Sequence, residues 1–340
     1  MERKSGISFG DGIPAEMLRS QYGSVSAVPA EAAELAFRLV LPRVWSRVSD
    51  LPMAPLASDA FSLAAAFKRD ENTNVQILIT PLPFEVNLVD WLEFQAYLHG
   101  FKLAAVLSGE TSCGQTVHAA ASAADGSELR LMVVGNGPKV VLLVGTMPAG
   151  APSLDRETLG AAAASFEFLT SCRQITRERI GSYLDRESLF QLQFPGSWSY
   201  QAMDRLRPEK AGVDFRLTGE AKIFAYLRVE ADTRVSLDDT GLEQLFQLSI
   251  DEIEEAGVSI SQIHPVPEGA GVGKRERWLG ECTWGGIAAQ VALLFRRTPH
   301  GWLSAILLCP EKSLNPMVWM RAKRAYEIAA ATLSVVPQGE

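Results

Sequence analysis

The sequence predicts an α+β fold of two tandem domains, each an antiparallel sheet covered by helices. The chain has 340 residues, which is long for one ordinary core and suits two domains. One phrase occurs twice, as FRLVLPRVWS from Phe37 and as FQLQFPGSWS from Phe190, at an offset of 153 residues. Starting with this phrase, both halves show the same order of patterns: three strands, a helix, four strands and a second helix.

The composition predicts a folded protein without a polyanionic partner. Hydrophobic residues make up 47% and charged residues 21% of the chain, as in globular proteins. The formal net charge is −8 and no Lys/Arg block stands out, whereas nucleic acid or an anionic membrane requires a basic footprint. The charged N-terminus lacks the apolar stretch of a secretory signal. No run approaches the roughly 20 apolar residues of a membrane-spanning helix.

The four cysteines, Cys113, Cys172, Cys282 and Cys309, are scattered and form no C-x-x-C pair. This distribution is typical of reduced thiols in a cytoplasmic protein, so we expect a cytoplasmic location. An exported protein with two disulfides stays as the alternative.

The first half begins with residues 1–34, which are rich in Gly, Ser, Ala and Pro. They predict a partly disordered arm with a short helix near 30–35. The first domain is expected over residues 35–171. Its strands are expected at 37–41, 59–68, 74–80, 103–107, 116–123, 128–134 and 139–145, and its helices at 88–101 and 153–169.

The second half begins with a short charged linker, expected over residues 172–187. The second domain is expected over residues 188–337. Its strands are expected at 189–194, 212–218, 222–230, 258–264, 275–284, 288–296 and 302–308, and its helices within 236–256 and 315–335. The shared order predicts an internal duplication, with a period too long for a solenoid repeat.

Two strands indicate how the layers are arranged. The segments KVVLLV (139–144) and WLSAILL (302–308) are apolar on both strand faces. An antiparallel strand with one wet face would alternate. Both strands therefore need cover on both sides, which predicts a helix–sheet–helix sandwich. Alternatively, the other repeat or a partner covers one face.

The opening pattern F-x-[apolar]-x-[apolar]-P-x-x-W, followed by this order of elements, resembles the PsbP-like fold. More narrowly, it resembles the DcrB-related bacterial proteins, which include the Eag-type chaperones of type VI secretion effectors. The pattern stands at Phe37–Trp45 and again at Phe190–Trp198. As two copies, the resemblance covers nearly all the chain from about residue 35 to residue 336.

This resemblance implies a non-enzymatic binding or assembly protein without a cofactor. The Eag-type chaperones shield hydrophobic effector segments and act as dimers of single domains, which a covalent tandem would imitate. This chain departs from them, because they are roughly half as long and have no such N-terminal arm. The partner implied is a protein client of a bacterial secretion system.

The residues show no catalytic constellation. In GAGVGKR (269–275), only three residues separate Gly269 from Gly273 and Arg275 replaces the hydroxyl residue, so we expect a hairpin loop instead of a P-loop. Cys113 and His118 are five residues apart, and along an extended strand they would point to opposite faces. The four histidines, His99, His118, His264 and His300, show no zinc-ligand spacing.

Acidic pairs occur at Asp238-Asp239 and in the run Asp251, Glu252, Glu254, Glu255. On a helix, such a run is typical of a solvated face, or of an acidic docking stripe. A hydrolase would need convergent acids in a cleft.

Large apolar side chains near the C-terminus are the candidates for partner binding, because aromatic anchors and adaptable Met surfaces suit protein clients. They are Trp284, Trp302, Met317, Trp319 and Met320. The same residues also fit ordinary burial in the core, as Trp45 and Trp198 do.

Three functions stay open. The first is a chaperone or adaptor that shields apolar segments of a protein client, which requires an exposed apolar patch. The second is a scaffold subunit of a larger assembly, which requires a mixed, partly polar patch. The third is an enzyme, which requires a concave pocket with convergent titratable groups.

Overall fold

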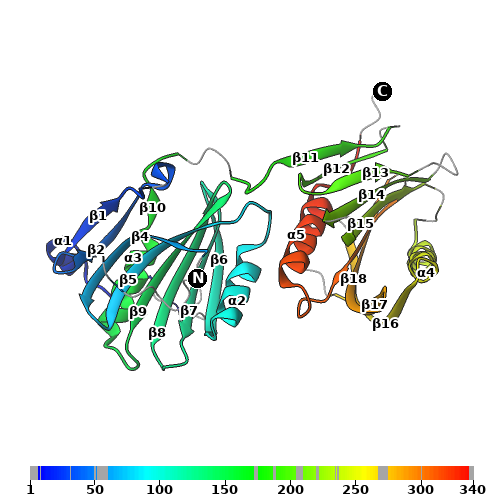
Figure 1. Cartoon of the computed structure of the whole chain (residues 1–340). Helices are drawn as coiled ribbons and strands as arrows, with labels where there is room; N and C mark the ends of the chain where they lie inside the picture. The colour runs from blue at the N-terminus through cyan, green and yellow to red at the C-terminus, as the bar shows by residue number, and fades with distance from the viewer. Residues whose placement is uncertain are drawn as a thin grey trace. The chain divides into compact units, whose positions relative to one another are not determined.

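The computed structural model describes residues 7, 9–30, 32–49, 51, 60–171, 175–186, 189–203, 210–219, 222–233, 235, 237–266, 275–299 and 301–336. The chain forms two compact units (Figure 1). Unit 1 comprises Met1–Pro83 with Asn87–Arg177, and unit 2 comprises Phe84–Val86 with Glu178–Glu340. The boundary between Arg177 and Glu178 lies inside the predicted linker.

Unit 1 is built on a seven-stranded antiparallel sheet in the order β3-β4-β5-β9-β8-β7-β6. These strands are β3 (Ser46–Val48), β4 (Ser62–Asp70), β5 (Thr73–Pro81), β6 (Lys102–Thr111), β7 (Gly114–Ser122), β8 (Glu128–Asn136) and β9 (Lys139–Met147). A smaller sheet contains β1 (Tyr22–Ala27), β2 (Phe37–Pro42) and β10 (Glu167–Phe168). The helices are α1 (Ala15–Gln21), α2 (Leu88–Leu98) and α3 (Ser153–Ala164), with a 3-10 turn at Ala33–Leu35.

Unit 2 repeats this topology, with a seven-stranded sheet in the order β13-β14-β15-β19-β18-β17-β16. These strands are β13 (Ser199–Ala202), β14 (Lys210–Gly219), β15 (Lys222–Asp232), β16 (Val258–Pro265), β17 (Arg275–Trp284), β18 (Ile287–Thr298) and β19 (Gly301–Pro310). The smaller sheet contains β11 (Ile180–Leu184), β12 (Phe190–Pro195) and β20 (Ser334–Val335). The helices are α4 (Asp239–Glu255) and α5 (Pro316–Thr332). The α+β class and the tandem of two sheet-based domains are confirmed.

The repeated phrase forms the middle strand of the smaller sheet in each unit. Phe37 on β2 and Phe190 on β12 are both fully buried. Each strand ends at its proline. After it, Trp45 packs against the core of unit 1 and Trp198 is buried in the core of unit 2. The phrase therefore recurs because each unit anchors its smaller sheet in the same way.

Both faces of the large sheet in unit 2 are covered by helices. On β19, Ala305 and Leu307 pack in the same core cluster as residues of α5. Their neighbours Ile306 and Leu308 pack in the cluster that contains Leu245 of α4. Because neighbouring side chains on a strand point to opposite faces, α4 and α5 lie on opposite sides of the sheet. All of β19 is buried, as its doubly apolar sequence predicts.

The structure differs from the sequence-based expectation where short segments pair over long distances. The arm contains α1 and β1, and β1 pairs with β2 from Tyr22 opposite Pro42 to Ala27 opposite Phe37. The predicted linker contains β11, which pairs with β12. The helix expected over 153–169 ends at Ala164, because the following residues form β10 and pair with β2. These segments are too short to show a period, so pairing decides their structure.

Candidate functional site

The five residues expected to bind a partner are divided between the two faces of the sheet in unit 2. Trp284 and Trp302 belong to the core on the α4 face. Trp319 packs against the core on the α5 face. Also on α5, Met320 is not exposed at all and Met317 is half-buried. Trp302 is 6% exposed, so neither it nor Met320 offers a contact surface.

Trp319 is held by contacts within unit 2. Its indole Nε1 donates a hydrogen bond to Oε1 of Gln290 at 2.7 Å. The ammonium groups of Lys312 and Lys323 lie 4.9 and 5.0 Å from its ring centroid, within the range of a cation–π interaction. Two of the five residues border a cavity: Trp302 borders a small one of about 20 Å³, and Trp284 borders a much larger one.

That cavity lies on the α4 face of unit 2 and has a volume of about 320 Å³. We call it the α4-face cavity. Its apolar part comprises Ile223, Ile253, Ala256, Val258, Trp284, Ile306 and Leu308, and its charged wall comprises Asp214, Arg216, Tyr226, Arg228 and Glu252.

The charged wall arises from the alternation of two neighbouring strands. On β14, Val213 and Phe215 point into the core on the α5 side, so Asp214 and Arg216 between them point to the α4 side. On β15, Tyr226 and Arg228 follow the same rule. This alternation is visible in the sequence and indicates one polar strand face, although none of these four residues was among the predicted binding residues.

The wall is a connected set of hydrogen bonds and ion pairs. The Tyr226 hydroxyl donates to the Asp214 carboxylate. Nε of Arg228 lies 3.0 Å from Oδ1 of Asp214 and 2.9 Å from the Tyr226 oxygen. Burial, and then the hydrogen bond to Asp214, raise the pKa of Tyr226 far above its ordinary value. Burial lowers the pKa of Arg228, but its contacts with Asp214 outweigh this effect and raise it.

A third cation, Lys210, extends the wall through its contact with Glu252. Its ammonium lies 3.0 Å from Oε2 of Glu230 and 3.0 Å from Oε1 of Glu252. Glu230 is 7% exposed, and burial raises the pKa of its carboxyl despite the nearby Lys210. Glu252 belongs to the acidic run of α4. In that run, Asp251 is exposed as expected, whereas Glu252 is only partly exposed because it contacts Lys210.

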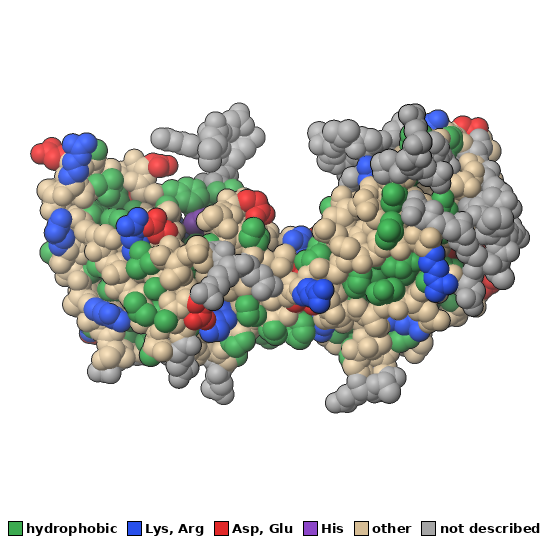
Figure 2. All heavy atoms as spheres, turned by 90° about the horizontal axis from the view of Figure 1, so that it is seen from above, with side chains coloured by type: hydrophobic (Ala, Val, Ile, Leu, Met, Phe, Trp, Pro, Cys, Tyr) green, Lys and Arg blue, Asp and Glu red, His purple; other side chains and the backbone are tan. Residues whose placement is uncertain are grey.

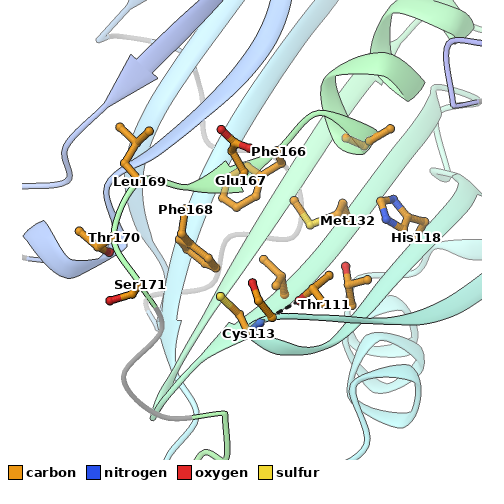
Figure 3. A pocket seen from close by; sticks show the side chains of 15 residues that line it. Thr111, Cys113, His118, Met132, Phe166, Glu167, Phe168, Leu169, Thr170 and Ser171 are labelled. Carbon is orange, nitrogen blue, oxygen red and sulfur yellow. Dashed lines mark hydrogen bonds between the residues drawn. The ribbon is translucent and has the colours of Figure 1, made fainter.

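Unit 1 has a cavity of about 450 Å³ in a different place, on the α3 face of its sheet (Figure 3). Its wall includes Thr111, Cys113, His118, Met132 and the segment 166–171. The expectation that Cys113 and His118 point to opposite faces is wrong. Cys113 lies in the turn before β7, so the alternation along an extended strand does not reach it, and both residues line one cavity.

These two residues do not form a nucleophile and base. Cys113 is disulfide-bonded, and its partner lies outside the described residues, so Cys113 has no thiol that could attack a substrate. Burial lowers the pKa of His118, which keeps its imidazole neutral, and Phe9 packs edge-on against it at 5.2 Å between ring centroids. The expectation of reduced thiols holds for Cys282 and Cys309 and is wrong for Cys113.

The remaining sequence candidates either lie outside the described residues or have another role. Residues 269–274 of GAGVGKR, and also His300 and Cys172, lie outside the described residues. Asp238 caps the N-terminus of α4 by accepting a hydrogen bond from the amide of Gly241 at 2.9 Å. Within the described part of the chain, no cluster of His, Cys, Asp and Glu could hold a metal ion, and no helix is long and apolar enough to cross a membrane.

No family model and no curated protein matches the sequence. Solved structures similar to this chain include cyanobacterial PsbP (CyanoP) from Synechocystis, with 14% identity and a TM-score of 0.33, covering 49% of this chain and 98% of that chain. The T6SS immunity protein TplEi from Pseudomonas aeruginosa, complexed with "L" peptide, is 14% identical with a TM-score of 0.25, covering 93% of this chain and 99% of that chain. The Tle4–Tli4 complex matches at 13% identity with a TM-score of 0.23, covering 93% and 99%.

Proposed function

We propose that this chain is a non-enzymatic protein-binding chaperone or adaptor that holds an apolar segment of a protein client. The α4-face cavity of unit 2 carries the proposal, because it combines an apolar floor with a charged wall. Apolar contacts supply affinity at such a site, and charges at its wall select the orientation of the partner. A bacterial secretion system is the assembly that the resemblance of the sequence implies for such a client.

The described surface favours anchoring a short segment over shielding a long helix. Strongly exposed apolar side chains, such as Tyr97, Leu184 and Ile287, are spread over different elements. On the face shown in Figure 2, hydrophobic side chains lie in small groups among polar and charged ones. A patch for a long apolar helix would be contiguous over several hundred Å². This mixed surface supports a second candidate, a scaffold subunit that binds a folded partner.

An enzymatic function has less support. The cavity of unit 1 contains titratable groups, but Cys113 is oxidised and His118 is buried in its neutral form. Nucleophilic catalysis requires a free nucleophile within reach of a base. The described part of this cavity does not offer that pair.

Co-purification with matched variants tests the proposal. Ala256 and Ala164 are both exposed, and each lines one cavity. Tagged wild-type chain, Ala256→Trp and Ala164→Trp are recovered from the cells that naturally produce the protein, and bound proteins are identified by mass spectrometry. We expect a stoichiometric partner that is lost in Ala256→Trp and kept in Ala164→Trp. The opposite pattern, or a wild-type chain recovered alone as a monomer, overturns the proposal.

The cellular location has its own test. The sequence predicts a cytoplasmic protein, whereas the disulfide at Cys113 favours an oxidising compartment, where disulfides persist. Fractionation of cells combined with thiol labelling before lysis distinguishes the two. Recovery in the cytoplasm with Cys113 reduced supports the sequence prediction, and recovery outside it with Cys113 oxidised supports export.

A further inference from the structure

The α4-face cavity contains one cation whose charge is poorly compensated. Nε of Arg228 and the ammonium of Lys210 each lie 3.0 Å from a carboxylate. Among the described residues, the carboxylate that pairs with the Arg216 guanidinium is that of Asp214, whose Oδ2 lies 3.9 Å from a terminal nitrogen of Arg216. Nε of Arg216 is shielded from solvent and has no hydrogen-bond partner in the described part of the chain.

The carboxylates of the cavity wall are already neutralised by other groups. Asp214 accepts hydrogen bonds from Tyr226 and from Arg228. Glu252 accepts one from Lys210 at 3.0 Å. Among the described ionic groups of the wall, the guanidinium of Arg216 is therefore the one that has the weakest contact with an opposite charge and is left for an incoming partner. Its side chain is 37% exposed, so a ligand can reach it.

The apolar part of the same cavity adds a second requirement. Ile306 and Leu308 come from β19 and Trp284 from β17, and Ile223, which is 45% exposed, also lines the cavity. An apolar side chain in this cavity would bury these groups. A guanidinium binds a carboxylate with two parallel N–H···O bonds, which fixes its direction as well as its position.

We propose that the α4-face cavity selects a protein segment in which a large apolar side chain is adjacent to an Asp or Glu, and that Arg216 binds this carboxylate. This inference rests on the proposed function, since it names the chemistry of the client segment. A purely apolar segment leaves Arg216 without an anion. A basic segment brings a second positive charge to Arg216 and finds the wall carboxylates already paired.

Peptide display on the full-length protein tests the selectivity. A random heptapeptide library is selected on immobilised wild-type chain, on Arg216→Gln and on Ala256→Trp, with Arg38→Gln as the matched control. Arg38 is an exposed arginine of unit 1 that pairs with Glu167. We expect wild type and Arg38→Gln to enrich peptides with Leu, Ile, Phe or Trp next to Asp or Glu. Arg216→Gln should retain the apolar preference and lose the acidic one.

The affinity of one selected peptide then tests the contact itself. Fluorescence anisotropy measures the affinity of the selected acidic peptide and of its Asp→Asn or Glu→Gln variant. Both peptides are measured on the wild-type chain and on Arg216→Gln. We expect either change to weaken binding about tenfold, and the two together to weaken it no further, since they remove the same contact. Losses that multiply instead overturn the assignment to Arg216.

The outcomes separate this inference from the proposed function. If the wild-type chain enriches apolar peptides without an acidic residue, and Ala256→Trp no longer enriches them, the inference is overturned. The docking site of the proposed function is then retained. An acidic preference that persists in Arg216→Gln also overturns it. If the wild-type chain and Ala256→Trp enrich the same peptides equally, both the inference and the proposal that the α4-face cavity is a docking site are overturned.

Discussion

Units 1 and 2 have the same strand order, yet one face of their central strands differs in chemistry. The two units can be matched at equivalent β-hairpins. The hairpin between β8 and β9 pairs Asn136 with Lys139, and the hairpin between β18 and β19 pairs Thr298 with Gly301. Counted from these hairpins through the pairing with β9 and β19, the α2-side positions of β5 match the α4-side positions of β15. In unit 1 they are Asn74, Gln76, Leu78 and Thr80, and in unit 2 they are Tyr226, Arg228, Glu230 and Asp232.

The first set is closed off from solvent, whereas Tyr226 and Arg228 of the second set border open space. The four residues of unit 1 are at most 7% exposed. In unit 2, Tyr226 and Arg228 line the α4-face cavity. The covering helices also differ: α2 buries Leu88, Trp91 and Leu92 and packs on β6, β7 and β8, whereas α4 packs on β16 and buries Leu245 and Ile253 against residues of β18 and β19. One topology therefore supports a dry layer or a binding cavity, depending on one strand face and one helix.

The largest effect on stability is expected when the matched residues Leu78 and Glu230 are each replaced by the kind of residue that the other unit has there. Leu78 is fully buried, so Leu78→Glu places an unpaired carboxylate in a dry layer, and we expect unit 1 to lose about 4 kcal/mol. Glu230→Leu should cost less than about 1 kcal/mol, because Lys210 keeps Glu252. Hydrogen exchange read by mass spectrometry reports each unit separately. Equal losses in the two units would contradict the comparison, and Leu78→Met serves as the control.

The disulfide marks a second difference, since Cys113 of unit 1 is oxidised and Cys282 and Cys309 of unit 2 are free. We expect Cys113→Ser to destabilise unit 1 by about 3 kcal/mol, as disulfide removal commonly does, and to leave the exchange of unit 2 unchanged. In urea without reductant, two of the four cysteines should react with a thiol reagent. If all four cysteines react, Cys113 is not oxidised and the units do not differ in this respect.

In the native protein, the free cysteines should react slowly. Burial raises the pKa of Cys282 to about 11 and that of Cys309 to about 12, so little thiolate is present at neutral pH. Alkylation should therefore follow unfolding of unit 2. Labelling as fast as that of a free thiol in solution would contradict the burial of both side chains.

The ion pairs of the α4-face wall should contribute a smaller amount to unit 2. The substitution Lys210→Met removes the close cation from the carboxylate of Glu230, which is 7% exposed. Arg228 still pairs with this carboxylate, but at a distance of 4.0 Å. We expect a loss of about 2 kcal/mol, reduced because Lys210 is partly exposed. The double variant Lys210→Met, Glu230→Leu should recover most of the loss, since no buried charge is then left unpaired. Urea unfolding with a double-mutant cycle measures this, and additive losses would exclude the pairing.

Acid should affect the two units in opposite directions, with the smallest effect. His118 has a lowered pKa in the folded state because of burial, so its contribution to stability is present above the ordinary value of 6.5 and is lost as the pH falls through it. The loss is at most about 1.4 kcal/mol per pH unit. Glu230 has a raised pKa, so unit 2 gains stability as this carboxyl protonates. Hydrogen exchange at pH values of about 7.5 and about 5.5 tests this. His118→Gln should remove the effect in unit 1, and an unchanged pH dependence would exclude His118 as its source.

Much of the fold could be predicted, because long strands and helices show their own period. The strand expected over 275–284 is β17 without correction, and both doubly apolar segments lie in buried central strands. The short strands β1, β10, β11 and β20 were missed, because two to six residues carry no period and form only by pairing with β2 or β12. Of the residues expected to bind a partner, Trp284 lines the cavity, whereas Trp302 and Met320 are buried; partner binding by these residues stays a prediction.

The sequence by itself determined the tandem of two α+β units, since repeated order and strand periodicity are local properties of the chain. It also contained the polar face of β14 and β15, as the alternation of Asp214 and Arg216 with Val213 and Phe215 shows. Only the tertiary structure decided that this face is open. A cavity depends on how a helix packs over its strands, and the C-terminal end of α4 leaves space beside β14 and β15. That arrangement follows from packing between residues far apart in the chain, which no local pattern specifies.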